Sequence, residues 1–201
     1  MIKPESSKQK FLDVALVLFS ERGFHGVSLA DISDSLGMTK QSVLYHFRTK
    51  EKLYGAVLAD LAVRFDLIVE NALLHQGDSI ERFRFFLSRL YDHMQSNPRD
   101  ARLIARELLD NLDRAHSDRK WYLRGFLDAS IDLLAELPGW SSCPIDTRTA
   151  AVCQWIGAIN YFVVAEHTFG AIWGCRRFEK TKNAFLDTLV AQYGNFQVPD
   201  M

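Results

Sequence analysis

The sequence predicts an all-α protein with an N-terminal three-helix head, residues 1–50, and a larger helical bundle, residues 51–201, that a long helix joins to the head. Two observations support this fold class. Apolar residues recur at intervals of three and four along the chain, which is the spacing of one helix face. From Gly77 onward there is neither the strict alternation of a half-buried strand nor an Asn-Gly or Asp-Gly hairpin signal.

Composition places the chain among ordinary globular proteins. Its 201 residues, 48% apolar and 24% charged, suffice for one large or two small domains with a sizeable core. A net charge of −1 argues against a surface that coats nucleic acid everywhere. Positive charge is local instead: residues 39–52 carry a net charge of +3, from Lys40, Arg48, Lys50 and Lys52 against Glu51 alone.

The cysteines indicate a reducing compartment. Cys143, Cys153 and Cys175 are odd in number and lack metal-ligand spacing. Because no signal peptide precedes them either, we expect a cytoplasmic protein.

Two short helices are expected after a first one. The first runs from about Lys10 to Arg22 and ends at Gly23, with Phe11, Ala15 and Leu18 on its apolar stripe. The second begins at Ser28, because Ser28 and Asp31 form an S-x-x-D capping pattern. Gly37 ends it, since glycine accepts the left-handed conformation that a helix C-terminus needs. The residues expected to form its buried stripe are Leu29, Ile32 and Leu36.

The next helix completes a helix-turn-helix. Thr39 is its expected cap, and Val43 and Phe47 lie four apart and point inward. A short helix, a glycine-containing turn and a second helix with long polar side chains define this motif. The second helix of the motif enters the DNA major groove with its N-terminal residues toward the base edges. Its polar surface is expected to consist of Lys40, Gln41, Tyr45 and His46.

These residues resemble the N-terminal domain of the TetR (tetracycline-repressor) family of bacterial transcription regulators. The resemblance runs from about Phe11 to Leu58 and has three pieces: F-L-D-V-A-L-V-L-F-S-E-R-G-F, V-S-L-A-D-I-S-D-S-L-G-M-T-K-Q-S-V-L-Y-H-F and T-K-E-K-L. It implies a homodimeric regulator that binds double-stranded operator DNA, most simply a repressor that a small molecule releases. Activation instead of repression stays open. The alternative is a helical ligand-binding or protein-interaction module without DNA-binding activity.

The candidate DNA site departs from the family pattern at two positions, where most relatives have a small residue instead of Gln41 and a tyrosine instead of Leu44. Glutamine can pair bidentately with adenine, so we expect Gln41 to read a base. Leu44 either packs into the head or meets a thymine methyl. Lys50 stands where the family places a backbone-contacting residue, and helix N-caps suit phosphate oxygens. The candidate DNA-contacting residues are Ser28, Thr39, Lys40, Gln41, Ser42, Leu44, Tyr45, His46 and Lys50.

Helices are expected throughout the rest of the chain. Thr49 caps a long one that extends to about His75. Asp78 and Glu81 form a capping pair for the next. Asn97-Pro98 starts another, because proline is favoured at the first helical position. Ser117 begins a further helix that carries Trp121 and stops at Pro138-Gly139.

The last two helices are expected to form the dimer interface. Residues 147–173 are apolar nearly all round, so this helix must be buried on more than one side. Polar residues such as Gln154 and Glu166 interrupt the run, which argues against a membrane span. We therefore expect a second subunit to cover one side. The final helix runs from about Arg177 to Tyr193, and the TetR resemblance implies that these two helices pair with their mates in a four-helix interface.

The resemblance also implies an effector pocket among the middle helices, which carry more aromatic side chains than packing needs. The effector is expected to be small and mostly apolar. Each candidate can equally be plain core, and the amide of Asn160 must find a partner in a ligand, a neighbouring helix or the other subunit. The candidates are Phe86, Leu90, His93, Met94, Trp121, Phe126, Trp155 and Asn160.

No catalytic motif is present, and we expect neither an enzyme nor a cofactor. G-x-G-x-x-G, G-x-x-x-x-G-K-[ST], H-E-x-x-H and G-x-S-x-G are all absent. Asp110, Asp113 and His116 suggest a metal site, but their spacing spreads them around a helix, so no metal is expected. Cys175 precedes two arginines at a helix start, where a redox role is less expected than an ordinary thiol.

Overall fold

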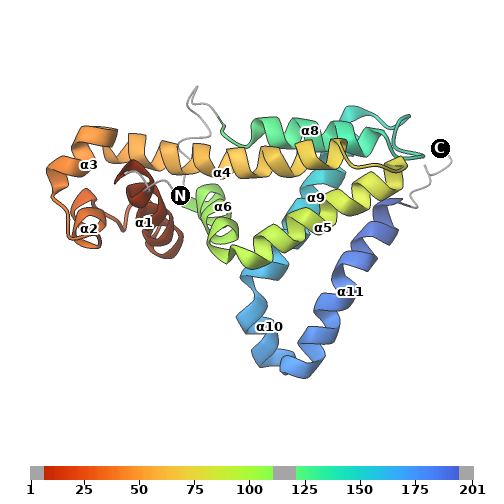
Figure 1. Cartoon of the computed structure of the whole chain (residues 1–201). Helices are drawn as coiled ribbons and strands as arrows, with labels where there is room; N and C mark the ends of the chain where they lie inside the picture. The colour runs from red at the N-terminus through yellow and green to blue at the C-terminus, as the bar shows by residue number, and fades with distance from the viewer. Residues whose placement is uncertain (1–6, 111–120, 195–201) are drawn as a thin grey trace. The chain divides into compact units, whose positions relative to one another are not determined.

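The computed structural model describes residues 7–110 and 121–194, and every regular element in that part of the chain is an α-helix (Figure 1). The predicted all-α class is confirmed. Packing divides the chain into a first unit, Met1–Val63 with Arg99–Tyr122, and a second unit, Arg64–Pro98 with Leu123–Met201. The boundary predicted at residue 50 stays a prediction about function, because these units are defined by packing.

The first unit contains the predicted head and one further helix. Its elements are α1 (Ser7–Arg22), α2 (Leu29–Asp34), α3 (Lys40–Phe47), the start of α4 (Lys50–Leu73) and α6 (Pro98–Asp110). Its core brings together the inward residues of all these helices: Phe11, Ala15, Phe19, Ile32, Val43, Phe47, Leu53, Tyr54, Ala101 and Leu103.

The predicted caps of the helix-turn-helix are confirmed. Ser28 and Asp31 form a reciprocal capping box at α2, and the Thr39 side chain accepts from the Ser42 amide at the start of α3. Gly37 has φ +62°, the left-handed conformation that the turn requires. The predicted stripe on α2 is wrong in part. Because the helix already ends at Asp34, Leu36 lies in the turn and is only half-buried.

α6 is tied to the rest of the first unit by polar contacts that the sequence analysis did not predict. Arg106 donates from Nε to the Ser20 carbonyl at 2.9 Å and from a terminal nitrogen to the Glu21 carbonyl at 2.6 Å. These carbonyls lie in the last turn of α1, where no intrahelical donor remains for them. The buried Tyr54 of α4 donates from its hydroxyl to Glu107 at 2.6 Å.

The second unit is a helical bundle in which α11 packs on α5, and α9 packs on both α5 and α8. Its elements are the remainder of α4, α5 (Ser79–Ser96), α8 (Arg124–Ala135), α9 (Ile145–Val164), α10 (Glu166–Trp173) and α11 (Cys175–Gly194). Its core is strongly aromatic and includes Phe65, Phe83, Phe86, Leu90, Met94, Phe126, Leu134, Trp155, Ile159 and Phe162.

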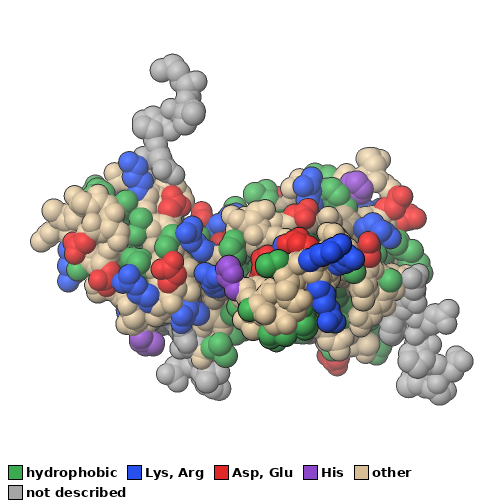
Figure 2. Space-filling view, turned by 90° about the horizontal axis from the view of Figure 1, so that it is seen from below, with side chains coloured by type: hydrophobic (Ala, Val, Ile, Leu, Met, Phe, Trp, Pro, Cys, Tyr) green, Lys and Arg blue, Asp and Glu red, His purple; other side chains and the backbone are tan. Residues whose placement is uncertain are grey.

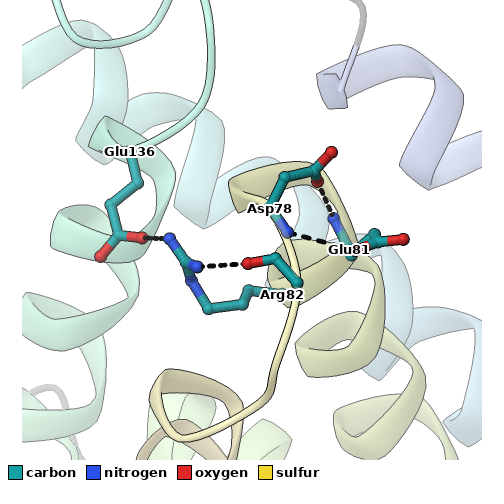
Figure 3. Close-up of polar contacts among 5 residues, drawn as sticks. Asp78, Glu81, Arg82 and Glu136 are labelled. Carbon is teal, nitrogen blue, oxygen red and sulfur yellow. Dashed lines mark hydrogen bonds and ion pairs between the residues drawn. The ribbon is translucent and has the colours of Figure 1, made fainter.

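Figure 3 shows how the start of α5 is fixed in this bundle. Asp78 and Glu81 form the predicted capping box, with Asp78 accepting from the Glu81 amide at 2.8 Å. Arg82 donates to the Gly77 carbonyl and, at 2.6 Å, to Glu136, the residue that follows α8. One arginine thus links the N-terminal end of α5 to the C-terminal end of α8.

Two predicted helices have different bounds. The predicted start at Ser117 lies outside the described residues, and the helix that can be described, α8, begins only at Arg124, so Trp121 precedes it. The apolar segment 147–173 is not one helix, because it breaks at Ala165 into α9 and α10. Among the described residues, no helix combines the length and the apolar character that crossing a membrane requires.

Candidate nucleic-acid interface and ligand site

α3 separates a buried face from an exposed one as predicted. Val43 and Phe47 are buried against the head, while Lys40, Gln41 and His46 are exposed. Tyr45 is 84% exposed, which leaves a nearly free aromatic ring on the outer face. Leu44 is 36% exposed, so it only partly packs against the head and also presents methyl groups outward.

The first turn of α3 is held in place by its cap. Thr39 Oγ1 accepts from the Ser42 amide at 3.3 Å, and the hydroxyls of Thr39 and Ser42 lie 3.1 Å apart. A capped helix start presents its remaining amides to a phosphate, and the helix dipole favours the negative charge there. Gln41 lies in this first turn, so the position predicted to read a base is exposed on a capped helix start.

A surface hollow in the head brings three predicted DNA-contacting residues together. Ser28, Lys40 and Lys50 line it, along with His25, which the sequence analysis did not select. Lys50 Nζ lies 4.3 Å from the ring centroid of Phe24, a cation–π contact. Burial lowers the pKa of Lys50 from its usual value, and the carboxylates of Glu51 and Asp31 partly oppose this.

Ser28 is already engaged within the head. Its hydroxyl and its amide each donate to Asp31 Oδ2 at 2.7 Å, and its hydroxyl oxygen accepts from the Asp31 amide at 3.1 Å. The hydrogen bond from the Ser28 side chain, followed by that from its backbone, lowers the pKa of Asp31. A phosphate contact by Ser28 therefore has to replace one of these bonds, whereas Lys40 is exposed.

The predicted ligand-binding residues fall mostly into the core of the second unit. Phe86, Leu90, Met94, Phe126 and Trp155 are buried there, and His93 and Asn160 are half-buried. Trp121 belongs to the first unit and is 40% exposed, so the structure does not group it with the others. The assignment of all these residues to ligand binding stays a prediction.

Four ring contacts connect the aromatic candidates Trp155, Phe86 and Phe126 with His93 into one row. Trp155 lies 5.4 Å from Phe86 between ring centroids, and Phe86 lies 6.2 Å from Phe126. Phe65 continues the row, at 5.1 Å from Phe126 and 5.4 Å from His93. Phe65 was predicted only as part of the helix stripe, because its ligand-site neighbours come from other helices.

The remaining chemistry-bearing residues add no further site. Among the described residues, no group of His, Cys, Asp or Glu side chains could hold a metal ion, and Asp113 and His116 lie outside that part of the chain. Cys153 and Cys175 are exposed and Cys143 is buried. On the face shown in Figure 2, basic and acidic side chains are interspersed, in keeping with the net charge of −1.

Comparison with known proteins agrees with this geometry. The family model described as "Bacterial regulatory proteins, tetR family" matches residues 11–57, which span α1 to the start of α4. The transcriptional regulator RutR of Escherichia coli K12 is 26% identical over 160 residues, covering 78% of this chain and 74% of RutR. IcaR of Staphylococcus epidermidis, a negative regulator of the biofilm operon icaADBC, is 47% identical over 88 residues, covering 42% of this chain and 46% of IcaR.

Solved structures match over almost the whole chain. The fatty acid degradation regulator FadR from Bacillus halodurans superposes with a TM-score of 0.70 at 15% identity, covering 95% of this chain and 96% of FadR. A TetR-like regulator from Rhodococcus sp. RHA1 gives a TM-score of 0.66 at 17% identity, with 95% and 96% coverage. At these identities the structures establish the shared fold, while the family model and RutR carry the sequence relationship. Residues 11–57 therefore form a DNA-binding head of the TetR family of bacterial transcription regulators, and the chain as a whole is similar to regulators of that family.

Proposed function

We propose that this regulator is a homodimeric repressor that binds operator DNA through α3 and is released when a small, mostly apolar ligand binds in the second unit. The observation that carries the DNA-binding half is α3 itself. It is a capped helix whose buried face fixes it to the head and whose other face presents Lys40, Gln41 and Tyr45 to solvent. Such a helix fits a major groove.

Dimer formation is supported by the outer face of the last helices. On α9, Cys153, Gly157, Tyr161 and Val164 are exposed and follow each other at helical spacing, as do Ala184, Thr188 and Ala191 on α11. These are small or apolar side chains, the kind that a closely packed interface covers. A two-fold dimer presents α3 twice and so matches two half-sites.

Release by ligand follows from linkage between two binding equilibria. If the ligand prefers a dimer conformation that operator DNA does not, ligand binding lowers operator affinity. By reciprocity, operator DNA lowers ligand affinity by the same factor. The aromatic core of the second unit, which contains most of the predicted ligand-binding residues, supports a small and largely apolar ligand. A bacterial repressor acts where the chromosome lies, so we assign it to the cytoplasm.

Salt-dependent DNA binding tests the proposal and the role of Lys50. We expect the wild type to shift the DNA upstream of its own gene, with log affinity falling linearly with log salt. Lys50→Ala should weaken binding to all sequences alike and flatten that slope by about 0.9 per half-site, because one phosphate contact is lost. Lys180→Ala is the control, since this exposed lysine lies on α11.

Two outcomes contradict the proposal at different levels. An unchanged slope of log affinity against log salt in Lys50→Ala would show that Lys50 makes no phosphate contact and only packs on Phe24. Failure of the wild type to bind any DNA at low salt would favour the alternative, a helical module without DNA-binding activity.

A further inference from the structure

Trp155 and Arg148, both of α9, each have a buried side-chain nitrogen without a hydrogen-bond partner among the described residues, and Trp155 is the more deeply buried of the two. Trp155 is 0% exposed, and its indole Nε1 is buried without a hydrogen-bond acceptor among the described residues. A buried donor without a partner costs about 1–3 kcal/mol. That is a large fraction of the roughly 5–15 kcal/mol by which a native protein is stable.

Trp140 shows that this fold can satisfy a buried indole. Trp140 is 3% exposed, and its Nε1 donates to the Tyr193 carbonyl at 2.9 Å. The other two tryptophans, Trp121 and Trp173, are 40% and 38% exposed and so are open to water. Trp155 is thus neither open to solvent nor paired with another of the described residues, although phenylalanine would fill most of its space without a donor.

The surroundings of Trp155 argue against a buried water as the missing partner. The rings packed on it are those of Phe83 and Phe86 of α5, at 6.4 and 5.4 Å and nearly perpendicular to the indole. A buried water needs two to four polar partners, and these rings offer none. A ligand that supplies the missing hydrogen-bond acceptor must therefore be apolar apart from that one acceptor atom.

The same row of rings points to an aromatic body. From Trp155 it runs through Phe86 and Phe126 to Phe65 and His93, and none of its neighbouring pairs is stacked face to face. Aromatic pairs favour edge-to-face and offset-stacked arrangements. An aromatic ligand ring can therefore pack against the rings of this row in either arrangement. The widest centroid separation within this row, 6.2 Å, is between Phe86 and Phe126.

The row also has an outer end. His93 lines an open surface hollow together with Asn71 and Arg89. At the buried end, the ring neighbours of the indole, Phe83 and Phe86, carry no charge, and the half-buried Arg148 of α9 lies seven residues before Trp155, about 10 Å along the helix. A carboxylate held there by one hydrogen bond would lose its hydration without an opposite charge, which is far more costly than burying a neutral carbonyl.

We propose that Trp155 anchors the effector, by donating its indole N–H to the neutral carbonyl-type oxygen of a small aromatic molecule that inserts beside Phe86 and Phe126. This inference rests on the proposed function, because it names the ligand class of the site through which the repressor is released. It adds a specific role, hydrogen-bond donor, to one buried residue.

Two planar isosteres test the donor role. Acetophenone carries a carbonyl oxygen where α-methylstyrene carries a methylene group, so the two differ only in the acceptor. With ¹⁵N-labelled protein, the indole N–H signal of Trp155 should move downfield with acetophenone and not with α-methylstyrene. The four tryptophan signals are assigned from single Trp→Phe variants, and Trp155 can be assigned by elimination if its own variant does not fold.

Dissociation constants give the second readout. The ketone-to-alkene affinity ratio should fall about fivefold in Trp155→Phe, as expected for the loss of one net hydrogen bond, and stay unchanged in Trp140→Phe. Comparing this ratio between wild type and variant cancels the effect of the greater hydrophobicity of the alkene, because that effect is present in both proteins. The proposal is overturned if neither compound binds, if both move the Trp155 signal alike, or if the ratio survives in Trp155→Phe. Operator binding by the same wild-type preparation is measured separately, so failure here is distinguishable from failure of the proposed repressor function.

Discussion

Gln41 is the residue on which sequence reading by this protein is expected to depend. It is exposed in the first turn of α3, next to the Thr39 cap, and an amide can pair with both N6 and N7 of adenine. Gln41→Ala should cost about 1–3 kcal/mol on the cognate operator and little on non-specific DNA, relaxing the preference at one base pair per half-site. Binding-site selection with both proteins measures this.

A matched control separates base reading from general effects of the substitution. Gln192 is an exposed glutamine on α11, so Gln192→Ala should leave the selected site unchanged. If Gln41→Ala also selects the wild-type site, the glutamine is a solvated surface residue and the base contact has to come from another side chain of α3.

Tyr91 of α5 makes the stability of the second unit sensitive to alkaline pH. Burial raises the pKa of its phenol from 10.0 to about 12, while its hydroxyl oxygen accepts from Gln95 at 2.9 Å. Between these two values the unfolded chain releases a proton that the native protein retains, so stability falls as pH rises. Below pH 10 both states keep the proton and this residue has no effect.

The variant Tyr91→Phe should therefore lose less thermal stability than the wild type between pH 10 and 12. The raised pKa values of Lys182, hydrogen-bonded to Glu179 and Glu166, and of the buried Tyr193 add losses at alkaline pH that both proteins share. Tyr45→Phe is the control, because Tyr45 is 84% exposed and lies outside the proposed dimer interface. Melting curves that stay parallel for wild type and Tyr91→Phe would show that Tyr91 ionises normally.

At the scale of helices, Arg106 is the residue that makes α6 part of the first unit. Its two hydrogen bonds satisfy the Ser20 and Glu21 carbonyls at the end of α1, and a cation there also suits the helix dipole. Arg106→Ala leaves these carbonyls without their donor, so we expect a loss of about 1.5–3 kcal/mol in the free energy of unfolding. Urea denaturation of variant and wild type measures it.

Arg102 provides the control on the same helix. It makes no hydrogen bond or ion pair with the described residues, so Arg102→Ala should change stability by less than about 0.5 kcal/mol. Since α1 braces α2 and α3, Arg106→Ala should also weaken operator binding. Equal stabilities for the two variants would mean that water replaces the guanidinium at the end of α1 without loss.

The elements that the sequence predicted are those whose signals are local. Ser28, Thr39 and Asp78 each cap a helix through a residue three positions away, and all three caps are present. The break at Ala165 carries no glycine or proline, so hydrophobic periodicity alone could not locate it. Arg106 donates to the carbonyls of Ser20 and Glu21, which lie 86 and 85 residues away in the sequence. A local sequence pattern cannot predict a contact over that separation.

The candidate sites follow the same division. The exposed face of α3 could be predicted, because the buried positions Val43 and Phe47 fix which side of a short helix faces solvent. That this face contacts DNA stays a prediction. The row of rings among the candidate ligand-binding residues could not be predicted in detail, since its members come from α4, α5, α8 and α9 and their neighbours depend on packing. The sequence could not predict that Nε1 of Trp155 has no acceptor among the described residues. Trp140 is also a tryptophan, yet its Nε1 has an acceptor.

At the scale of the whole molecule, we expect the two-fold symmetry of the proposed dimer to decide how strongly the protein binds its operator. A single α3 contacts one half-site, and a dimer adds the second contact without a second loss of translational freedom. The exposed face of α9 that we assign to the interface centres on Gly157 and Tyr161. In an isologous interface every residue occurs twice, so one substitution changes both sides of the contact.

Tyr161→Glu places two carboxylates at that interface, where each loses hydration and repels its mate. We expect the dimer dissociation constant to rise by about 100-fold or more, equivalent to at least about 2.7 kcal/mol, with a steep loss of operator affinity. Sedimentation and gel shift at equal protein concentration measure both. Leu67→Glu is the control, because Leu67 of α4 is also exposed, at 50%, and receives the same charge. If Tyr161→Glu remains dimeric and binds operator as the wild type does, the interface lies elsewhere on the chain.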